Sequence, residues 1–325
     1  MDSTKLHFLN VGHGDCTIIE HPSGRLTMID INNSKNLPED DEVALAEAKG
    51  LSLSHFRQGS WEEYYRGLLV DPRDYWRDRF AGRMLFRYIQ THPDMDHLSG
   101  LASLFWGEKV TLGNFWDYDH AKKNSKLDFD KNRFNWNDWL AYLELREGNH
   151  GDGTTHTVIK RLRDETGSFW SEDGLTILGP TQDLIDYCDR IESWNNSSYV
   201  LRLDYGGRRV ILPGDAEKPA WDSIEAHLGG DDLACDILKA AHHGRESGYS
   251  ESAVDAMDPD FVICSIGKKP STDASDEYRR HGAKVLSTRY HGTITVQIWA
   301  DGEIWINDRN GERLHSVPPL GHTAA

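Results

Sequence analysis

The sequence predicts a layered α/β protein with strands in both halves of the chain. Short apolar runs of strand length recur along it and are bounded by Gly or Pro turns. Charged or amphipathic segments of helical length separate these runs. Clusters of His and Asp follow several of the expected strands, and active sites of layered α/β folds form where strands end.

The chain begins with an expected β-meander. Residues 5–11, 16–21 and 25–31 are apolar-rich, and the stretches "GHGD" and "PSG" interrupt them. Residues 33–82 have a strongly charged composition that favours helical or irregular structure. Residues 83–90, "RMLFRYIQ", are expected to form a strand that leads into a polar loop.

A polar stretch over residues 101–172 is predicted to be a second insertion, with helices near 134–146 and 155–166. Together with the charged range before it, this stretch would interrupt a single domain that spans residues 1–325. Its Trp-rich part, 104–142, is a candidate docking surface for a protein partner.

Strands return after the second insertion and again alternate with helices. The expected hairpins have "YGG" and "DG" at their turns. In chain order we expect a strand at 175–180, a hairpin at 197–215, a helix at 216–228, a strand at 235–244, helix then strand over 251–267, a helix at 276–282, a strand at 283–288 and a closing hairpin at 293–308.

Composition restricts the class of protein. Of the 325 residues, 38% are apolar and 27% are charged, which is typical of a globular chain. The net charge of −17 disfavours a general nucleic-acid coat protein or a membrane-surface binder. The sequence has neither an apolar run of bilayer-spanning length nor a secretory leader pattern, so we expect a cytoplasmic protein without membrane contact. The four cysteines are far apart and are expected to be buried free thiols.

The loop "THPDMDH", residues 91–97, holds four potential metal ligands. Imidazoles and carboxylates are natural ligands for zinc, manganese or iron. A tight loop can aim His92 and Asp94 at one ion, and Asp96 and His97 at another. The alternative is a polar turn before a helix, with Asp96 as its cap.

Two further candidates follow later strands. Asp215 ends the apolar run "VILPGD", where it is either a ligand or a simple turn or cap residue. His242 and His243 follow "LKAA" and precede Gly, and in an extended strand their rings diverge. One ring can then bind metal while the other orients it or meets substrate; the alternative is a pair of hydrogen-bonded core histidines. Chance is a much poorer explanation for all three, the loop 91–97, Asp215 and the 242–243 pair, than for any one of them.

These residues resemble motifs of the metallo-β-lactamase fold superfamily, and in particular of the hydrolase domain of ComEC-type DNA-uptake proteins and their free-standing relatives. The histidine-rich loop of the superfamily reads here His92-Pro-Asp94-Met-Asp96-His97. The other matching motifs are "VGHGD" (11–15), "MIDINN" (28–33), "NNSS" (195–198), "PGDAE" (213–217), "HHGRES" (242–247) and "CSIG" (264–267).

The resemblance implies an αββα four-layer sandwich, with two mixed sheets face to face and helices outside. It implies a metal-dependent hydrolase with two divalent ions, Zn or Mn, and a phosphodiester substrate such as DNA or RNA. His92, Asp94 and Asp215 would hold one ion. Asp96, His97, Asp215 and either His242 or His243 would hold the other, with Asp215 bridging. Asp96, Asp215 and His243 are the expected catalytic residues.

Side chains around these ligands receive supporting roles in the same interpretation. Asp15 and Asn195 are expected to orient the ligands through hydrogen bonds. Cationic donors match phosphate oxygens, and the alternative for each is a solvated surface charge. The phosphate-binding candidates are Arg245, Lys268, Lys269, Arg289 and His291.

Two other functions stay open at this stage. The same metals can hydrolyse carbon esters, lactones or thioesters. The fold can also serve as a metal-binding or partner-docking module without catalysis, although every expected ligand position here carries a residue that can bind metal.

Overall fold

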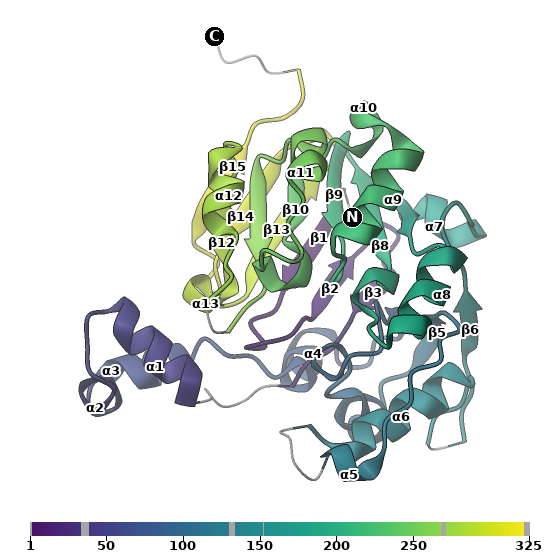
Figure 1. The fold of residues 1–325 in the computed structure, drawn as a ribbon, viewed down its shortest axis with the longest axis horizontal. Coiled ribbons are helices and arrows are strands. Elements are labelled where there is room, and N and C mark those ends of the chain that lie inside the picture. Colours follow the sequence, from purple (N-terminus) through teal and green to yellow (C-terminus); the bar gives the residue numbers. More distant parts are fainter. Residues whose placement is uncertain (1, 34–38, 130–133, 152, 268–270, 322–325) are drawn as a thin grey trace.

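Two mixed β-sheets form the centre of the molecule (Figure 1). The computed structural model describes residues 2–33, 39–129, 134–151, 153–267 and 271–321. Within them, the first sheet has nine strands in the order β15 (Arg313–Val317), β14 (Ile304–Asn307), β13 (Ile294–Trp299), β1 (Ser3–Phe8), β2 (Thr17–Glu20), β3 (Leu26–Ile29), β4 (Leu85–Ile89), β5 (Leu112–Asp117) and β6 (Thr157–Lys160). The second has six, in the order β12 (Lys284–Ser287), β11 (Phe261–Cys264), β10 (Ile237–Lys239), β9 (Arg208–Leu212), β8 (Val200–Tyr205) and β7 (Leu175–Gly179).

Each sheet combines antiparallel and parallel pairs. Neighbours from β15 to β3 run antiparallel, whereas β3, β4, β5 and β6 are parallel. In the second sheet β9 to β12 are parallel, and β7, β8 and β9 are antiparallel. Parallel neighbours end at the same edge of a sheet, so β4 of one sheet and β9 and β10 of the other deliver their loops to a shared region.

Helices cover both outer faces. The described helices are α1 (Glu39–Ala48), α2 (Leu53–Gln58), α3 (Ser60–Arg66), α4 (Pro72–Phe80), α5 (Lys126–Phe129), α6 (Trp136–Arg146), α7 (Ser168–Glu172), α8 (Gln182–Ile191), α9 (Lys218–Leu228), α10 (Gly230–Leu233), α11 (Glu251–Met257), α12 (Ser275–Arg280) and α13 (Thr288–His291). In the part of the chain that the structure describes, none of them is long and apolar enough to cross a bilayer.

The apolar core has layers because strand residues alternate in direction. One cluster lies between the sheets and includes Phe8 of β1 and Ile263 of β11. A second packs α4 and α6 on the outer face of the first sheet, and a third packs α9, α11 and α12 on the second sheet. The predicted αββα sandwich is therefore confirmed. Helices α1 to α3 have a small apolar cluster of their own and project from the sheets (Figure 1).

The range 101–172 contributes more to the sheet than its composition predicts. The expected helix at 155–166 is wrong, because residues 157–160 form β6 and pair in parallel with β5. The β-branched residues of "TVIK" favour a strand beside β5. The free edge of β5 that they pair with exists only in the folded protein, so the local sequence does not reveal it. The helix expected near 134–146 is confirmed as α6. Trp116 of β5 and Trp139 of α6 are fully buried, so neither indole is available to a partner.

All four cysteines are free and buried, as predicted.

Candidate metal centre

The loop after β4 is organised around Asp30. The Asp30 carboxylate accepts hydrogen bonds from the Thr91 backbone N–H (2.8 Å) and from the Thr91 hydroxyl (2.7 Å). It also lies 2.7 Å from Nδ1 of His97, which ends the short 3-10 turn Met95–His97. Asp30 has a positive φ of 56°, a conformation that most residues avoid. The motif "MIDINN" alone does not assign Asp30 a role, although an acidic residue directly after a buried strand is a signal for one.

Four buried side chains from four separate segments converge beside this loop. Asp15, His97, Asp215 and His243 each offer a ligand atom, and these atoms all lie within 4.8 Å of one another. Asp215 Oδ2 is 3.2 Å from His97 Nε2 and 3.4 Å from His243 Nε2. Asp15 was expected to support the ligands from behind, whereas the structure places it within the cluster itself.

Asp96 lies on the more exposed side of this cluster. Its Oδ2 is 3.5 Å from His243 Nε2 and 3.8 Å from His13 Nε2, and these three residues form a second group of possible ligands. Sequence reasoning did not single out His13, although the "GHGD" stretch contained it. The Asp96 side chain is 22% exposed, while those of His97 and His243 are fully buried. Solvent therefore reaches the cluster from the Asp96 side.

The histidine doublet reaches the site through an unusual backbone. His242 and His243 both have left-handed φ and ψ angles, at 46° and 50° and at 57° and 18°. Such angles are costly for residues other than Gly and are concentrated at functional sites. They turn His243 into the cluster, whereas Nδ1 of His242 faces Glu217 (3.1 Å) and the Ser247 hydroxyl (2.7 Å). His242 Nε2 still lies 3.8 Å from Asp215 Oδ2.

Two glycines allow the segments to approach. A Cβ on Gly14 would lie 2.4 Å from the Asp96 carbonyl oxygen, and Gly14 has a φ of 146°. A Cβ on Gly214, which has a φ of 56°, would lie 2.9 Å from Cβ of Thr91. The "GHGD" and "PGD" motifs therefore need Gly at these positions so that Asp15 and Asp215 can reach the loop.

The remaining expected ligands lie next to the cluster. The His92 ring centroid is 4.2 Å from that of His97, and its Nδ1 is 3.3 Å from the Ser198 hydroxyl. The Asp94 carboxylate contacts the ammonium of Lys122 and lies 3.8 Å from His92 Nε2. Asn195 donates to Glu217 Oε1 (3.3 Å), and that atom also contacts His242. Asn195 is thus linked to the doublet through one intervening carboxylate.

Two lysines that sequence reasoning missed bring positive charge to these carboxylates. Lys239 Nζ is 2.5 Å from Asp15 Oδ2, and both side chains are only 4% exposed. Lys122 belongs to the second insertion. Its Nζ contacts the Asp94 carboxylate and lies 4.9 Å from the centroid of the Trp194 ring. No local sequence signal points to Lys122, because it lies 28 residues from Asp94.

The carboxylates and the imidazoles of the cluster shift the pKa values of one another. Burial disfavours a charged imidazole, but the carboxylates of Asp215 and Asp30 outweigh it and raise the pKa of His97 well above the usual value. The same competition, with Asp215 and Asp15 as the carboxylates, raises the pKa of His243 to about 9. Burial raises the pKa of Asp215, yet the His243 and His97 charges lower it well below the usual range.

Buried polar atoms without hydrogen-bond partners indicate whether these residues can bind a metal. Nε2 of His92, His97 and His243 and Oδ1 of Asp215 are buried and have no hydrogen-bond partner within the described ranges. Buried polar atoms are normally satisfied, so several such atoms in one place need a ligand. Neutral imidazole nitrogens and carboxylate oxygens are a donor set that binds zinc or manganese. The fit to a divalent cation is therefore good.

The expected phosphate-binding residues are not all at the cluster. Arg245 Nη2 lies 3.4 Å from His13 Nε2, next to Asp96. Arg289 and His291 line a separate cavity beside α12 and α13. Lys268 and Lys269 lie outside the described residues.

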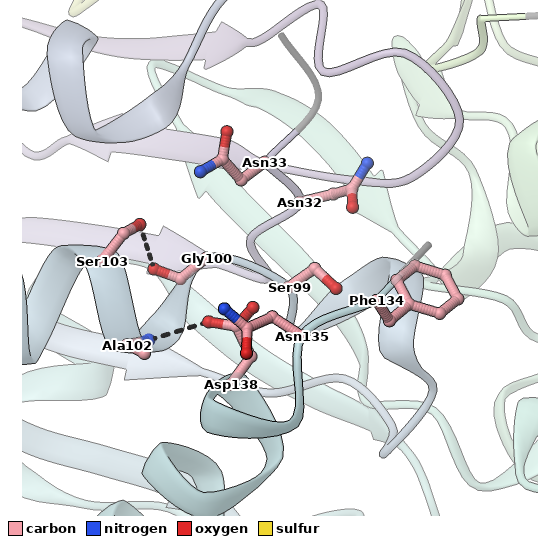
Figure 2. A pocket seen from close by; sticks show the side chains of 9 residues that line it. All are labelled: Asn32, Asn33, Ser99, Gly100, Ala102, Ser103, Phe134, Asn135 and Asp138. Atoms are coloured by element: carbon pink, nitrogen blue, oxygen red, sulfur yellow. Dashed lines mark hydrogen bonds between the residues drawn. The ribbon is translucent and has the colours of Figure 1, made fainter. Parts of the chain in front are cut away.

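A further cavity of about 210 Å³ adjoins the loop through Ser99 and Gly100 (Figure 2). Its lining is mostly polar, with Asn32, Asn135 and Asp138 among the residues and Phe134 on one side. Asp138 accepts a hydrogen bond from the Ala102 backbone N–H (3.0 Å), and burial raises its pKa to about 6. Asn32 donates to the carbonyl oxygens of Val11 and His13, and so supports the "GHGD" segment.

Comparison with known proteins gives distant relatives for about one third of the chain. No family model matches it. It is 34% identical over 107 residues to ComE operon protein 3 of Bacillus subtilis, which covers 31% of this chain and 14% of the relative. It is 30% identical over 113 residues to competence protein ComA of Neisseria gonorrhoeae (33% and 16%) and 30% identical over 112 residues to recombination protein 2 of Haemophilus influenzae (33% and 14%). The chain thus matches about one seventh of the length of these relatives.

Two solved structures resemble the chain over most of its length. The metallo-β-lactamase fold protein YhfI of Bacillus subtilis has a TM-score of 0.42 and 11% identity, over 94% of this chain and 100% of that one. Igni18, a metallo hydrolase of Ignicoccus hospitalis, has a TM-score of 0.48 and 14% identity, over 90% and 98%.

Proposed function

We propose that this chain, a metallo-β-lactamase fold protein distantly related to a region of the competence proteins, is a metal-dependent phosphodiesterase. The observation that carries the proposal is the convergence of four buried ligand atoms, from Asp15, His97, Asp215 and His243, within 4.8 Å. A buried group of this kind is expensive to maintain without a function.

We assign the cation first to these four residues, with Asp96 completing the set from the solvent side. A second ion on His92, Asp94 and Asp215 remains the expectation from the sequence. A divalent cation would supply a Lewis acid that activates water and offsets the negative charge of the substrate. The three carboxylates of this ligand set favour manganese, whereas its two imidazoles favour zinc.

The protein groups hold the ligands in a defined state. Asp30 accepts from Nδ1 of His97 (2.7 Å), and the Ser265 carbonyl oxygen is 3.2 Å from Nδ1 of His243. Each contact fixes the proton on Nδ1 when the ring is neutral, so the unprotonated Nε2 faces the cluster with a lone pair that can bind a metal. Contact with His243 and the charge of His97 lower the pKa of Asp96 despite its burial. Asp96 is then ionised at neutral pH, and its lowered pKa makes it a weak base, which suits a metal ligand better than a general base.

Local charge supports an anionic substrate. The chain as a whole has a net charge of −17, yet Lys122, Lys239 and Arg245 contact residues of the site. Arg245 is half-buried, and its Nη2 lies 3.4 Å from His13 Nε2 on the same side as Asp96. The relatives are named for competence and recombination, which agrees with a nucleic-acid phosphodiester.

The test is hydrolysis by protein that has been stripped with a chelator and reloaded with Mn²⁺ or Zn²⁺. Substrates are bis-p-nitrophenyl phosphate, single-stranded DNA and a panel of lactones. We expect cleavage of the phosphodiesters and, with Asp215→Asn, a loss on the order of 100-fold or more. The matched control is Asp119→Asn, since the Asp119 side chain is 78% exposed. Activity on lactones alone would contradict the phosphodiesterase proposal and favour an ester or lactone hydrolase. Fewer than one bound ion per chain, with no activity, would favour a non-catalytic module.

A further inference from the structure

The cavity lined by Arg289 and His291 lies on the outer face of the second sheet. It has a volume of about 200 Å³ and is built from the ends of β11 and β12 together with α12 and α13. Cys264 and Ile266 form its apolar wall and belong to the core cluster under the outer helices. The residue between them, Ser265, directs its carbonyl oxygen to His243 instead. The cavity and the metal centre thus lie on opposite sides of the same strand end.

Arg289 is a buried cation at this cavity with no hydrogen-bonded side-chain or carboxylate partner among the described residues. It is 4% exposed, and its Nε and Nη2 are buried and make no hydrogen bond to any part of the chain that is described. Its guanidinium carbon lies 5.4 Å from the centroid of the Tyr290 ring, and it has no ion pair with a carboxylate of the described residues. Arg87, which is buried to a similar degree, pairs with Asp173 at 3.1 Å. Arginine keeps its proton in a protein, so a buried guanidinium without a counter-charge is unfavourable unless an anion joins it.

The surroundings of Arg289 favour an anion over a cation. Arg279 also lines the cavity, and so do the hydroxyls of Ser275 and Ser287. The lining includes one carboxylate, Asp273, which accepts a hydrogen bond from Ser275 (2.8 Å). Burial lowers the pKa of His291, another lining residue, which is therefore neutral at neutral pH and can donate a hydrogen bond.

We propose that this cavity binds a phosphate group through the guanidinium of Arg289, which lines it. Two parallel N–H groups on one edge of a guanidinium match two oxygens of a phosphate. The cavity is smaller than the roughly 300–1,000 Å³ of sites for drug-sized ligands, and so suits a single phosphate group. The site is separate from the metal centre and does not depend on hydrolysis there. Free phosphate and the terminal phosphate of a nucleic-acid strand share this chemistry.

The test is binding of inorganic phosphate to the chelator-treated full chain, by calorimetry and by thermal melting. We expect about one phosphate per chain, with affinity at least tenfold weaker in Arg289→Met and closer to the wild type in Arg289→Lys. The matched control is Arg280→Met, which removes a 67%-exposed arginine from α12 and should bind as the wild type does.

Melting in phosphate-free buffer separates a binding defect from a folding defect. Arg289→Met should melt at or above the wild-type temperature, because it removes an unpaired buried charge, while phosphate should raise the Tm of the wild type and of Arg280→Met only. Equal phosphate shifts in Arg289→Met and Arg280→Met, or no shift in the wild type, would overturn the site. Oligonucleotides with and without a 5′-phosphate identify the source: a preference for the phosphorylated strand over inorganic phosphate assigns a strand end, and equal affinity assigns the free anion. Because these measurements need no metal, they can fail while the phosphodiesterase proposal stands.

Discussion

Replacement of Lys239 by methionine should destabilise the metal-free protein strongly. Lys239 Nζ lies 2.5 Å from Asp15 Oδ2 in a site where both side chains are 4% exposed. At an effective dielectric constant of 20, that separation corresponds to an attraction of about 7 kcal/mol before desolvation. Removal of Lys239 leaves buried Asp15 with only the more distant His97 and His243 rings, at 3.9 and 3.8 Å, and loss of one partner of a buried ion pair typically costs about 3–5 kcal/mol. For a chain of this length, the expected fall in Tm is roughly 4–7 °C.

The assay is thermal and urea unfolding in the presence of a chelator, since a cation on Asp15 would offset the lost ammonium. Lys218→Met is the matched control, because Lys218 is 71% exposed and its pair with Asp222 contributes at most about 0.5 kcal/mol. Addition of Asp15→Asn to Lys239→Met should recover a large part of the loss, because the orphaned charge is then gone. A Tm for Lys239→Met that equals that of Lys218→Met, or no recovery in the double variant, would refute the reasoning.

Three further predictions concern the metal centre. Asp30→Asn should weaken metal affinity about 10–100-fold by releasing Nδ1 of His97, as measured by competition with a chromogenic chelator, with exposed Asp119→Asn unchanged. Lys122→Ala should free the Asp94 carboxylate and add up to one bound ion per chain in native mass spectrometry, whereas Lys123→Ala should not; equal ion counts would remove Lys122 from the site. The metal-free protein should lose stability as pH rises from about 6.5 through 9, because His243 has a folded pKa raised to about 9 and its imidazolium stabilises only while protonated. Metal binding must expel that proton, so affinity should increase over the same pH range, and an affinity that falls would contradict the assignment.

The strands that carry the ligands could be predicted from local patterns. Apolar runs bounded by turn residues located β1 to β4 and β7 to β14, and the motifs at their ends named Asp96, His97, Asp215 and the 242–243 doublet as candidates. Hydrophobic periodicity and Gly punctuation are written into each segment, so no partner needs to be known. Pattern failed at 155–166, where the open edge of β5 recruits residues 157–160 as a strand.

Which candidates share a site was decided by tertiary structure. The amino-acid order alone determined an α/β chain with His and Asp at strand ends, because side-chain periodicity and turn chemistry act over a few residues. It did not choose between His242 and His243, since that choice depends on two consecutive left-handed residues held by the packing around them. Nor did it identify Lys122 or Lys239, and although it named Arg289 as a phosphate-binding candidate, it did not predict the separate cavity that Arg289 lines. Ion pairs and voids form between segments distant in sequence, and only the fold brings their atoms within range of Coulombic attraction.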